Sequence, residues 1–387
     1  MDNLKTNTDF FGSSKKNDIT TSKRNSNIDL LRILSMIMII FLHLCSHGQL
    51  NRFFDISAMG IVLKCLHIVS LTSVNIFVFI SGYYLVESKF KISKLLILFL
   101  EVLLYSVGIF LFMLFIKKES FTLKDYLMVF LPISYNEYWF ISSYFGLYLL
   151  TPFLNMLINK VKKKEHFALI VVLFTINTVF RDLLPLSDPF LVNRGYSLVW
   201  FINLYFISSY IKKYLDCSKI KMPFLKFVII CLIGLMVWVC LKFLSQRISF
   251  INDYSLDTYW LRYNSIIVLL ASFYLFVSFL KIKQFFNKPL SKIIGIVSAL
   301  SLGTYLIQDN PFFRNYLWIT ILRTPTLEEN ALLIPKALLL VLLVFLSCCL
   351  IDAIRFCLFS LIQKSSLVKK AVGILDNCFI SQFQESD

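Results

Sequence analysis

The sequence predicts an all-α integral membrane protein with about ten transmembrane helices. Hydrophobic residues make up 58% of the 387-residue chain and charged residues only 16%, whereas a soluble domain carries about a quarter charged residues. The apolar residues also fall in long runs separated by short polar segments. One membrane-embedded unit therefore explains the chain better than two or three soluble domains.

A helix needs about 20 mainly apolar residues to span the hydrocarbon core of a bilayer. Ten successive apolar runs qualify as candidate spans, although the sixth and ninth are short: 28–48, 61–86, 95–116, 138–159, 167–184, 197–211, 224–244, 263–280, 293–308 and 331–362. The further apolar stretch 126–133 is too short to cross and favours a position in the membrane interface. Any chemistry must come from these helices and their loops, because no segment outside them is long enough to fold alone.

The two ends of the chain are polar. Residues 1–27 are rich in Lys, Ser, Asn and Thr, which predicts a disordered tail. No cleavage site follows the first apolar run, so we expect a retained helix and not a signal peptide. Residues 363–387 form the predicted C-terminal tail, which leaves 28–362 as the transmembrane domain.

The placement of Lys and Arg predicts that both termini are cytoplasmic. Loops and helix ends on the N-terminal side carry 24 of the 39 basic residues and those on the opposite side carry 13. By the positive-inside rule the N-terminal side is the cytoplasmic one. Tryptophans at or near the predicted outer helix ends would form an interfacial belt; they are Trp139, Trp200, Trp260 and Trp318.

The net charge of +16 does not indicate nucleic-acid binding. The basic residues form short clusters between apolar runs and not one basic face. The nine cysteines are scattered without a C-x-x-C pair, so neither a zinc site nor a disulfide framework is indicated. We therefore expect no metal.

The first predicted helix carries a polar stripe. Arg32 and His43 are eleven residues apart, which is about three helical turns, so both lie on one face about 16 Å apart. Asp29 is one turn before Arg32 and can pair with it, and His47 is one turn beyond His43. Ionisable groups within a span mark either function or a buried pair. Both interpretations stay open, with His47 read as an interfacial residue.

Four segments together resemble the membrane-bound acyltransferase-3 family, whose members O-acylate bacterial surface carbohydrates. They are Arg32-x10-His43, Ser73-Val-Asn-Ile-Phe-Val-Phe-Ile-Ser81-Gly82-Tyr83, Tyr138-Trp139-Phe140 followed by Tyr148-Leu-Leu-Thr-Pro152, and Ser301-Leu-Gly-Thr-Tyr305-Leu-Ile. The resemblance extends from residue 28 to about residue 361, and the helix count agrees. Their order and spacing are more specific than any single motif.

Two departures from the family pattern matter. Lys91-Ile-Ser-Lys94 stands where members often have Arg-x-x-Arg, and lysine lacks the planar fork that grips a phosphate in two places. Gln308 stands where the late motif often has histidine; it can form hydrogen bonds but cannot act as a general base. The second departure places more weight on His43.

The resemblance implies an O-acetyltransferase of the bacterial plasma membrane with no permanently bound cofactor. Acetyl would pass from cytoplasmic acetyl-CoA to a hydroxyl of a surface polysaccharide or its lipid-linked precursor. His43 would be the general base, since its unperturbed pKa is near 6.5. Arg32, Lys91 and Lys94, at cytoplasmic helix ends, would bind the phosphates of CoA. A role of the two lysines in topology alone is equally open.

Other polar residues have two open interpretations each. Asn75 and Ser81 would bind a substrate carbonyl or a neighbouring helix, and Trp139 would stack on a sugar or belong to the belt. Glu101 would orient His43 or pair with a cation. In the last helix, Asp352 and Arg355 are one turn apart, and we interpret them as a self-contained structural pair.

Two other functions fit a multi-pass protein. A transporter or flippase for lipid-linked saccharides would explain a polar stripe, although such proteins tend to show repeated halves and no clear repeat is found here. A lipid-linked sugar polymerase would need more room than outer loops of about twenty residues provide. Motifs of ATP-driven pumps, dehydrogenases, zinc proteases and serine hydrolases are absent from the sequence.

Overall fold

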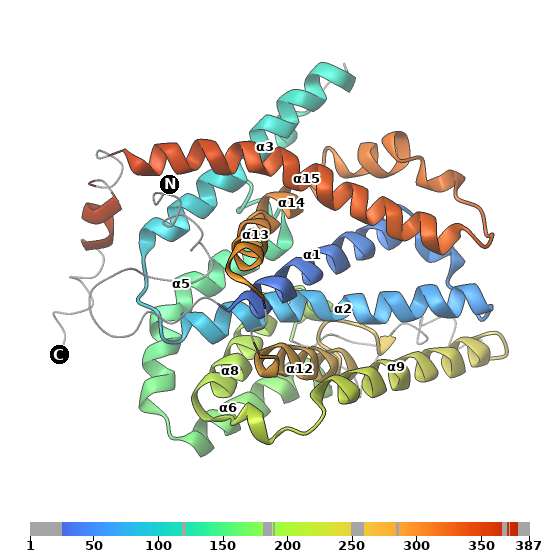
Figure 1. Cartoon of the computed structure of the whole chain (residues 1–387), viewed down its shortest axis with the longest axis horizontal. Helices are drawn as coiled ribbons and strands as arrows, with labels where there is room; N and C mark the ends of the chain where they lie inside the picture. The colour runs from blue at the N-terminus through green and yellow to red at the C-terminus, as the bar shows by residue number, and fades with distance from the viewer. Residues whose placement is uncertain are drawn as a thin grey trace.

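The computed structural model describes residues 25–117, 121–180, 188, 190–248, 259–283, 286–365, 370 and 372–377. Within these residues all regular elements are helices (Figure 1). They are α1 (Ser26–Ser46), α2 (Ala58–Leu85), α3 (Ile92–Lys117), α4 (Leu123–Phe130), α5 (Trp139–Lys160), α6 (Lys163–Phe174), α8 (Leu198–Tyr214), α9 (Pro223–Ser245), α12 (Ile266–Lys281), α13 (Lys288–Ala299), α14 (Ser301–Gln308) and α15 (Leu333–Lys364). The predicted tails lie mostly outside the described residues.

Seven stretches of the described chain are long and apolar enough to cross a membrane: α1, α2, α3, α5, α9, α13 with α14, and α15. The apolar helix α12 is shorter. The prediction of an all-helical, multi-pass membrane protein is therefore confirmed. Three of the ten predicted spans, 167–184, 197–211 and 263–280, are mostly helical where the structure describes them but are not among these seven.

Helix starts follow local capping chemistry. The Asn25 side chain accepts a hydrogen bond from the backbone N–H of Asn27 at the start of α1, and Ser57 caps α2 through Gly60. Thr122 and Asp125 form a reciprocal capping box at α4. Such caps satisfy backbone N–H groups that have no partner within the helix.

Contacts between helix ends mark one face of the molecule. At this face the Asn27 side chain at the start of α1 donates to the carbonyl of Ile282 after α12, over 2.6 Å, and Asn155 in the last turns of α5 donates to Leu85 at the end of α2. Figure 1 shows α15 running right to left and α1 running the opposite way. The start of α1 and the end of α15 thus lie toward the same side of the molecule.

Helix α1 lies in the interior and contacts α2, α12, α13, α14 and α15. Most of its residues are buried, including the polar Asp29, Arg32 and Ser35. By contrast, α9 exposes large apolar side chains such as Ile229, Leu232 and Met236. An apolar surface of this kind suits contact with lipid.

Two tryptophans do not belong to an interfacial belt. Trp200 and Trp318 are fully buried, and the indole of Trp200 donates to the Asn75 Oδ1 atom over 3.0 Å. The prediction that both lie at the lipid interface is therefore wrong. Sequence position predicts the depth of a residue along its helix but not the direction in which its side chain points.

A buried charge network joins α3 to α15. The Arg355 guanidinium donates to Glu101 Oε1 over 2.6 Å and to both oxygens of Asp352 over 2.8 Å, and Tyr105 also donates to Asp352. Of the two interpretations of Glu101, the structure supports pairing with a cation and not orientation of His43. The description of Asp352 and Arg355 as a self-contained pair is wrong. Asp352 also packs directly against Gly303, where a Cβ atom would collide with its carboxylate.

Candidate active site

The polar stripe of α1 meets the end of α14. The His43 Nδ1 atom and the Gln308 Oε1 atom are 2.8 Å apart. An amide oxygen only accepts hydrogen bonds, so in this arrangement Nδ1 carries the proton and Nε2 keeps its lone pair. Gln308 cannot be a base itself, but it holds His43 in the tautomer that leaves Nε2 available.

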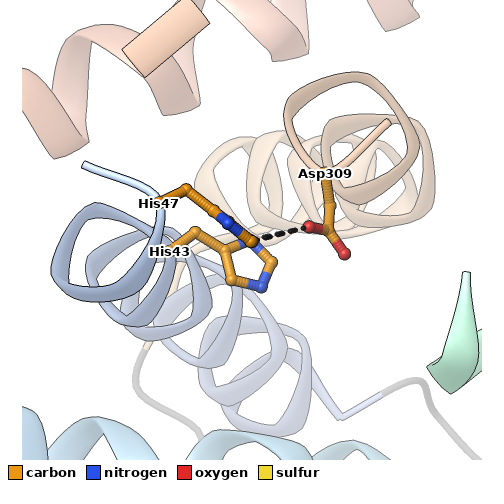
Figure 2. Close-up of side chains that lie close together, drawn as sticks. All are labelled: His43, His47 and Asp309. Carbon is orange, nitrogen blue, oxygen red and sulfur yellow. Dashed lines mark ion pairs between the residues drawn. The ribbon is translucent and has the colours of Figure 1, made fainter. Parts of the chain in front are cut away.

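A buried carboxylate follows Gln308 directly. Figure 2 shows Asp309 facing the two histidines of α1. Its Oδ1 atom lies 3.4 Å from His47 Nε2, 3.8 Å from His43 Nδ1 and 3.7 Å from an amino nitrogen of Arg314. Burial would raise the pKa of Asp309, but the two histidines and Arg314 outweigh burial and lower it. Asp309 therefore provides a negative charge beside His43.

Hydrogen bonds from two neighbouring residues hold the turn after α14. The Tyr138 hydroxyl donates to the Leu306 carbonyl over 3.0 Å and accepts from the Asn310 amide over 2.8 Å. Asn310 also donates to Glu137, which accepts from Ser106 as well. Burial raises the pKa of Glu137 to about 7. These bonds fix the backbone on both sides of Asp309.

His43, His47 and Asp309 also have the ligand types and spacing of a metal site, with one ligand atom from each lying within 4.8 Å of the others. However, Arg314 places a positive charge 3.7 Å from the same carboxylate oxygen, and Gln308 already engages His43 Nδ1. A cation would compete with both. We therefore interpret the three residues as a charge and hydrogen-bond cluster, and the absence of a metal stays a prediction.

A cavity of about 360 Å³ adjoins this cluster. On α1 its wall includes Met36, Ile39, His43 and His47, which repeat at helical spacing and span about 16 Å along the axis. Met36 lies one turn beyond Arg32. The cavity thus follows the same face of α1 as the Arg32–His43 stripe and ends one turn short of Arg32.

The two halves of the cavity differ in character. Beside the middle of α1 the wall consists of apolar side chains from α2 and α3: Leu71, Val74, Phe77 and Leu98. Near His43 and His47 it contains Trp139, Tyr196 and Tyr263. The Trp139 ring lies 4.3 Å from the Tyr196 ring and stacks on Tyr263 at 5.9 Å, measured between centroids. The cavity therefore brings Trp139 and His43 into one site.

Asn75 and Ser81 are engaged by the protein. The Asn75 amide donates to the Tyr263 carbonyl over 2.9 Å and its oxygen accepts from Trp200. Ser81 donates to the Phe77 carbonyl of its own helix. The structure thus supports the helix-contact interpretation for Asn75, and the described cavity wall includes neither residue.

The predicted cationic residues lie toward the other end of α1. An Arg32 amino nitrogen donates to Asp29 over 3.2 Å and to Ser298 over 3.1 Å, which ties α1 to α13. Lys91 and Lys94 lie at the start of α3, where the Tyr148 hydroxyl donates to the Lys91 carbonyl. None of the three cations is part of the described cavity wall.

Sequence reasoning missed Asp309 and Arg314 and gave His47 no role. The signal in the sequence for Asp309 was its position: it is an acidic residue directly after the late motif, where the ninth predicted span ends. Its partners on α1 lie more than 260 positions away in the chain, and nothing local to either segment predicts that they meet.

Comparison with protein families identifies a match over most of the chain. The model of a family described as an acyltransferase domain matches residues 25–353. Comparison with curated proteins and with solved structures found no match. The matched range begins with α1 and contains all the residues of the site.

Proposed function

The chain belongs to the acyltransferase-3 family and is therefore a membrane acyltransferase; we propose that it transfers acetyl from cytoplasmic acetyl-CoA to a hydroxyl of a surface polysaccharide or its lipid-linked precursor. The observation that carries this proposal is the position of His43. Its Nδ1 atom is held by Gln308, and it lies at the polar end of a cavity that runs toward Arg32. Family membership also favours an enzyme over the flippase and polymerase alternatives.

His43 is the general base in this proposal. The acceptor oxygen attacks the thioester carbonyl carbon while His43 Nε2 takes the hydroxyl proton. Asp309, 3.8 Å from His43 Nδ1, stabilises the imidazolium that forms. Collapse of the tetrahedral intermediate expels the CoA thiolate, which takes the proton back from His43. No proton is gained or lost overall.

The donor and the acceptor would enter from opposite ends of the cavity. Arg32, Lys91 and Lys94 would hold the CoA phosphates, and the acyl-bearing arm would follow the apolar wall along α1. Trp139 and its aromatic neighbours would stack on the faces of a sugar ring. In this proposal the chain crosses the plasma membrane of a bacterium ten times. The excess of basic residues on the N-terminal side of that arrangement supports a cytoplasmic position of both termini.

Transfer of label tests this function. Membranes that contain the protein and its native acceptor receive acetyl-CoA labelled in the acetyl group, and membranes without the protein serve as the control. We expect base-labile label in the carbohydrate fraction only when the protein is present. Label confined to free acetate, with the acceptor shown to be present, would contradict transfer to carbohydrate.

Replacing Gln308 with leucine is expected to lower kcat about 10- to 100-fold. The variant loses a hydrogen bond to a group that becomes charged during the reaction, a contribution of roughly 1.5–3 kcal/mol. Gln246→Leu is the matched control, because Gln246 is exposed at the end of α9. Steady-state rates at matched protein levels measure the effect, and unchanged kcat in folded Gln308→Leu would exclude this role.

A further inference from the structure

Helix α14 presents a second polar stripe to the cavity. Ser301, Tyr305 and Asp309 follow one another at intervals of four residues, and all three line the cavity wall. Each is at least 95% buried. The stripe belongs to the same helix end as Gln308, so α14 supplies several polar groups to the region around His43.

The hydroxyl of Tyr305 makes no hydrogen bond of normal geometry to any described residue, although the carboxylate of Asp309, one turn on, is near enough to interact with it. By contrast, the hydroxyl of the neighbouring Tyr138, whose ring centroid lies 5.9 Å away, both donates and accepts. Buried polar groups in proteins almost always have a partner. A buried phenol that lines a cavity without one therefore points to a ligand in that cavity.

Tyr305 is close to the proposed base. The rings of Tyr305 and His43 lie 6.3 Å apart between centroids. Of the other polar groups in the wall, Ser46 donates to the Leu42 carbonyl and Arg314 pairs with Asp309. Ser301 and His67 also have unpartnered polar atoms, but Ser301 lies one turn farther from Gln308, and the His67 ring packs against Phe54. Of these three groups, Tyr305 is the one whose ring lies beside that of His43.

We propose that Tyr305 is a catalytic residue whose hydroxyl donates a hydrogen bond to the carbonyl oxygen of the acyl group. This inference rests on the proposed acetyl-CoA-dependent function. When the acceptor oxygen bonds to the carbonyl carbon, the C=O π electrons move to that oxygen, and the acceptor proton moves to His43. Tyr305 keeps its own proton throughout and stabilises the oxyanion until the C–S bond breaks.

Two matched tyrosine variants test the assignment. Tyr305→Phe removes a hydroxyl without a partner, and Tyr205→Phe removes a buried hydroxyl that donates to Asn155 over 2.6 Å, outside the cavity wall. Tyr305→Phe is expected to lose about 10²- to 10³-fold in kcat, with the KM for acetyl-CoA and the melting temperature preserved. Tyr205→Phe is expected to melt at a lower temperature and keep its kcat.

A binding measurement separates this inference from the function on which it rests. The probe is the trifluoromethyl ketone analogue of acetyl-CoA, whose hydrate has a tetrahedral carbon, compared with S-propyl-CoA. We expect the wild type to bind the ketone more tightly than S-propyl-CoA. In Tyr305→Phe the ratio of the two dissociation constants should fall about 10-fold or more, which corresponds to the loss of roughly one hydrogen bond to an oxyanion. An unchanged preference together with unchanged kcat would overturn the role of Tyr305 and leave the function standing. A wild type that binds neither acetyl-CoA nor the analogues would overturn the donor assignment and this inference with it.

Discussion

His43→Ala is expected to lower kcat for acyl transfer by about 10²- to 10⁴-fold, the usual contribution of a positioned general base. The loss includes the base itself and the imidazolium that Asp309 stabilises, 3.8 Å away. Because the side chain lines a cavity of about 360 Å³, its removal leaves room for a free imidazole. Added imidazole should therefore restore part of the rate, which a structural role of His43 would not predict.

His166→Ala is the matched control for this variant. His166, at the start of α6, is also buried, but its ring contacts Phe206 and Tyr210 of α8, outside the cavity wall. It should lose stability and keep kcat per folded molecule. Rates are measured with labelled acetyl-CoA at equal amounts of folded protein. If His43→Ala folds and turns over like the wild type, another group is the base.

Arg355→Met is expected to destabilise the protein by about 3–5 kcal/mol, because it leaves two buried carboxylates without their cation. Glu101 and Asp352 both accept hydrogen bonds from Arg355, and both are less than 10% exposed. The measurement is the melting temperature in one detergent, with the yield of folded protein. A variant as stable as the wild type would show that the network contributes nothing to the fold.

The triple variant Glu101→Gln, Asp352→Asn, Arg355→Met is the decisive comparison. Replacing a whole buried ion network with neutral groups is often close to neutral in stability. The triple variant should therefore recover most of the loss caused by Arg355→Met alone. Because the described cavity wall includes none of the three residues, its activity per folded molecule should stay near that of the wild type.

The helical membrane fold could be predicted from the sequence because long apolar runs are a local property. The Arg32–His43 stripe was also predictable, since helical periodicity alone places both residues on one face of α1. The pairing of Asp29 with Arg32 follows from their spacing of one turn, and the structure shows that contact. Each of these conclusions depends on residues within a single helix.

The same reasoning could not predict contacts between helices. Glu101 pairs with Arg355, which is 254 positions away in the chain, and no property of either helix alone favours that partner over His43. Asp309 meets His43 and His47 only because α14 packs against α1. Trp200 illustrates the same limit, because its indole faces Asn75 in the interior and not the lipid.

The cavity along α1 has a thermodynamic consequence. One space reaches from within a turn of Arg32 to His47, and in the proposed reaction the donor and the acceptor would meet there. A thioester is a higher-energy acyl carrier than an oxygen ester, and the exchange of one bond for the other is therefore downhill. In the proposed reaction that chemical difference alone would set the direction of transfer, and neither an ion gradient nor nucleotide hydrolysis would be required.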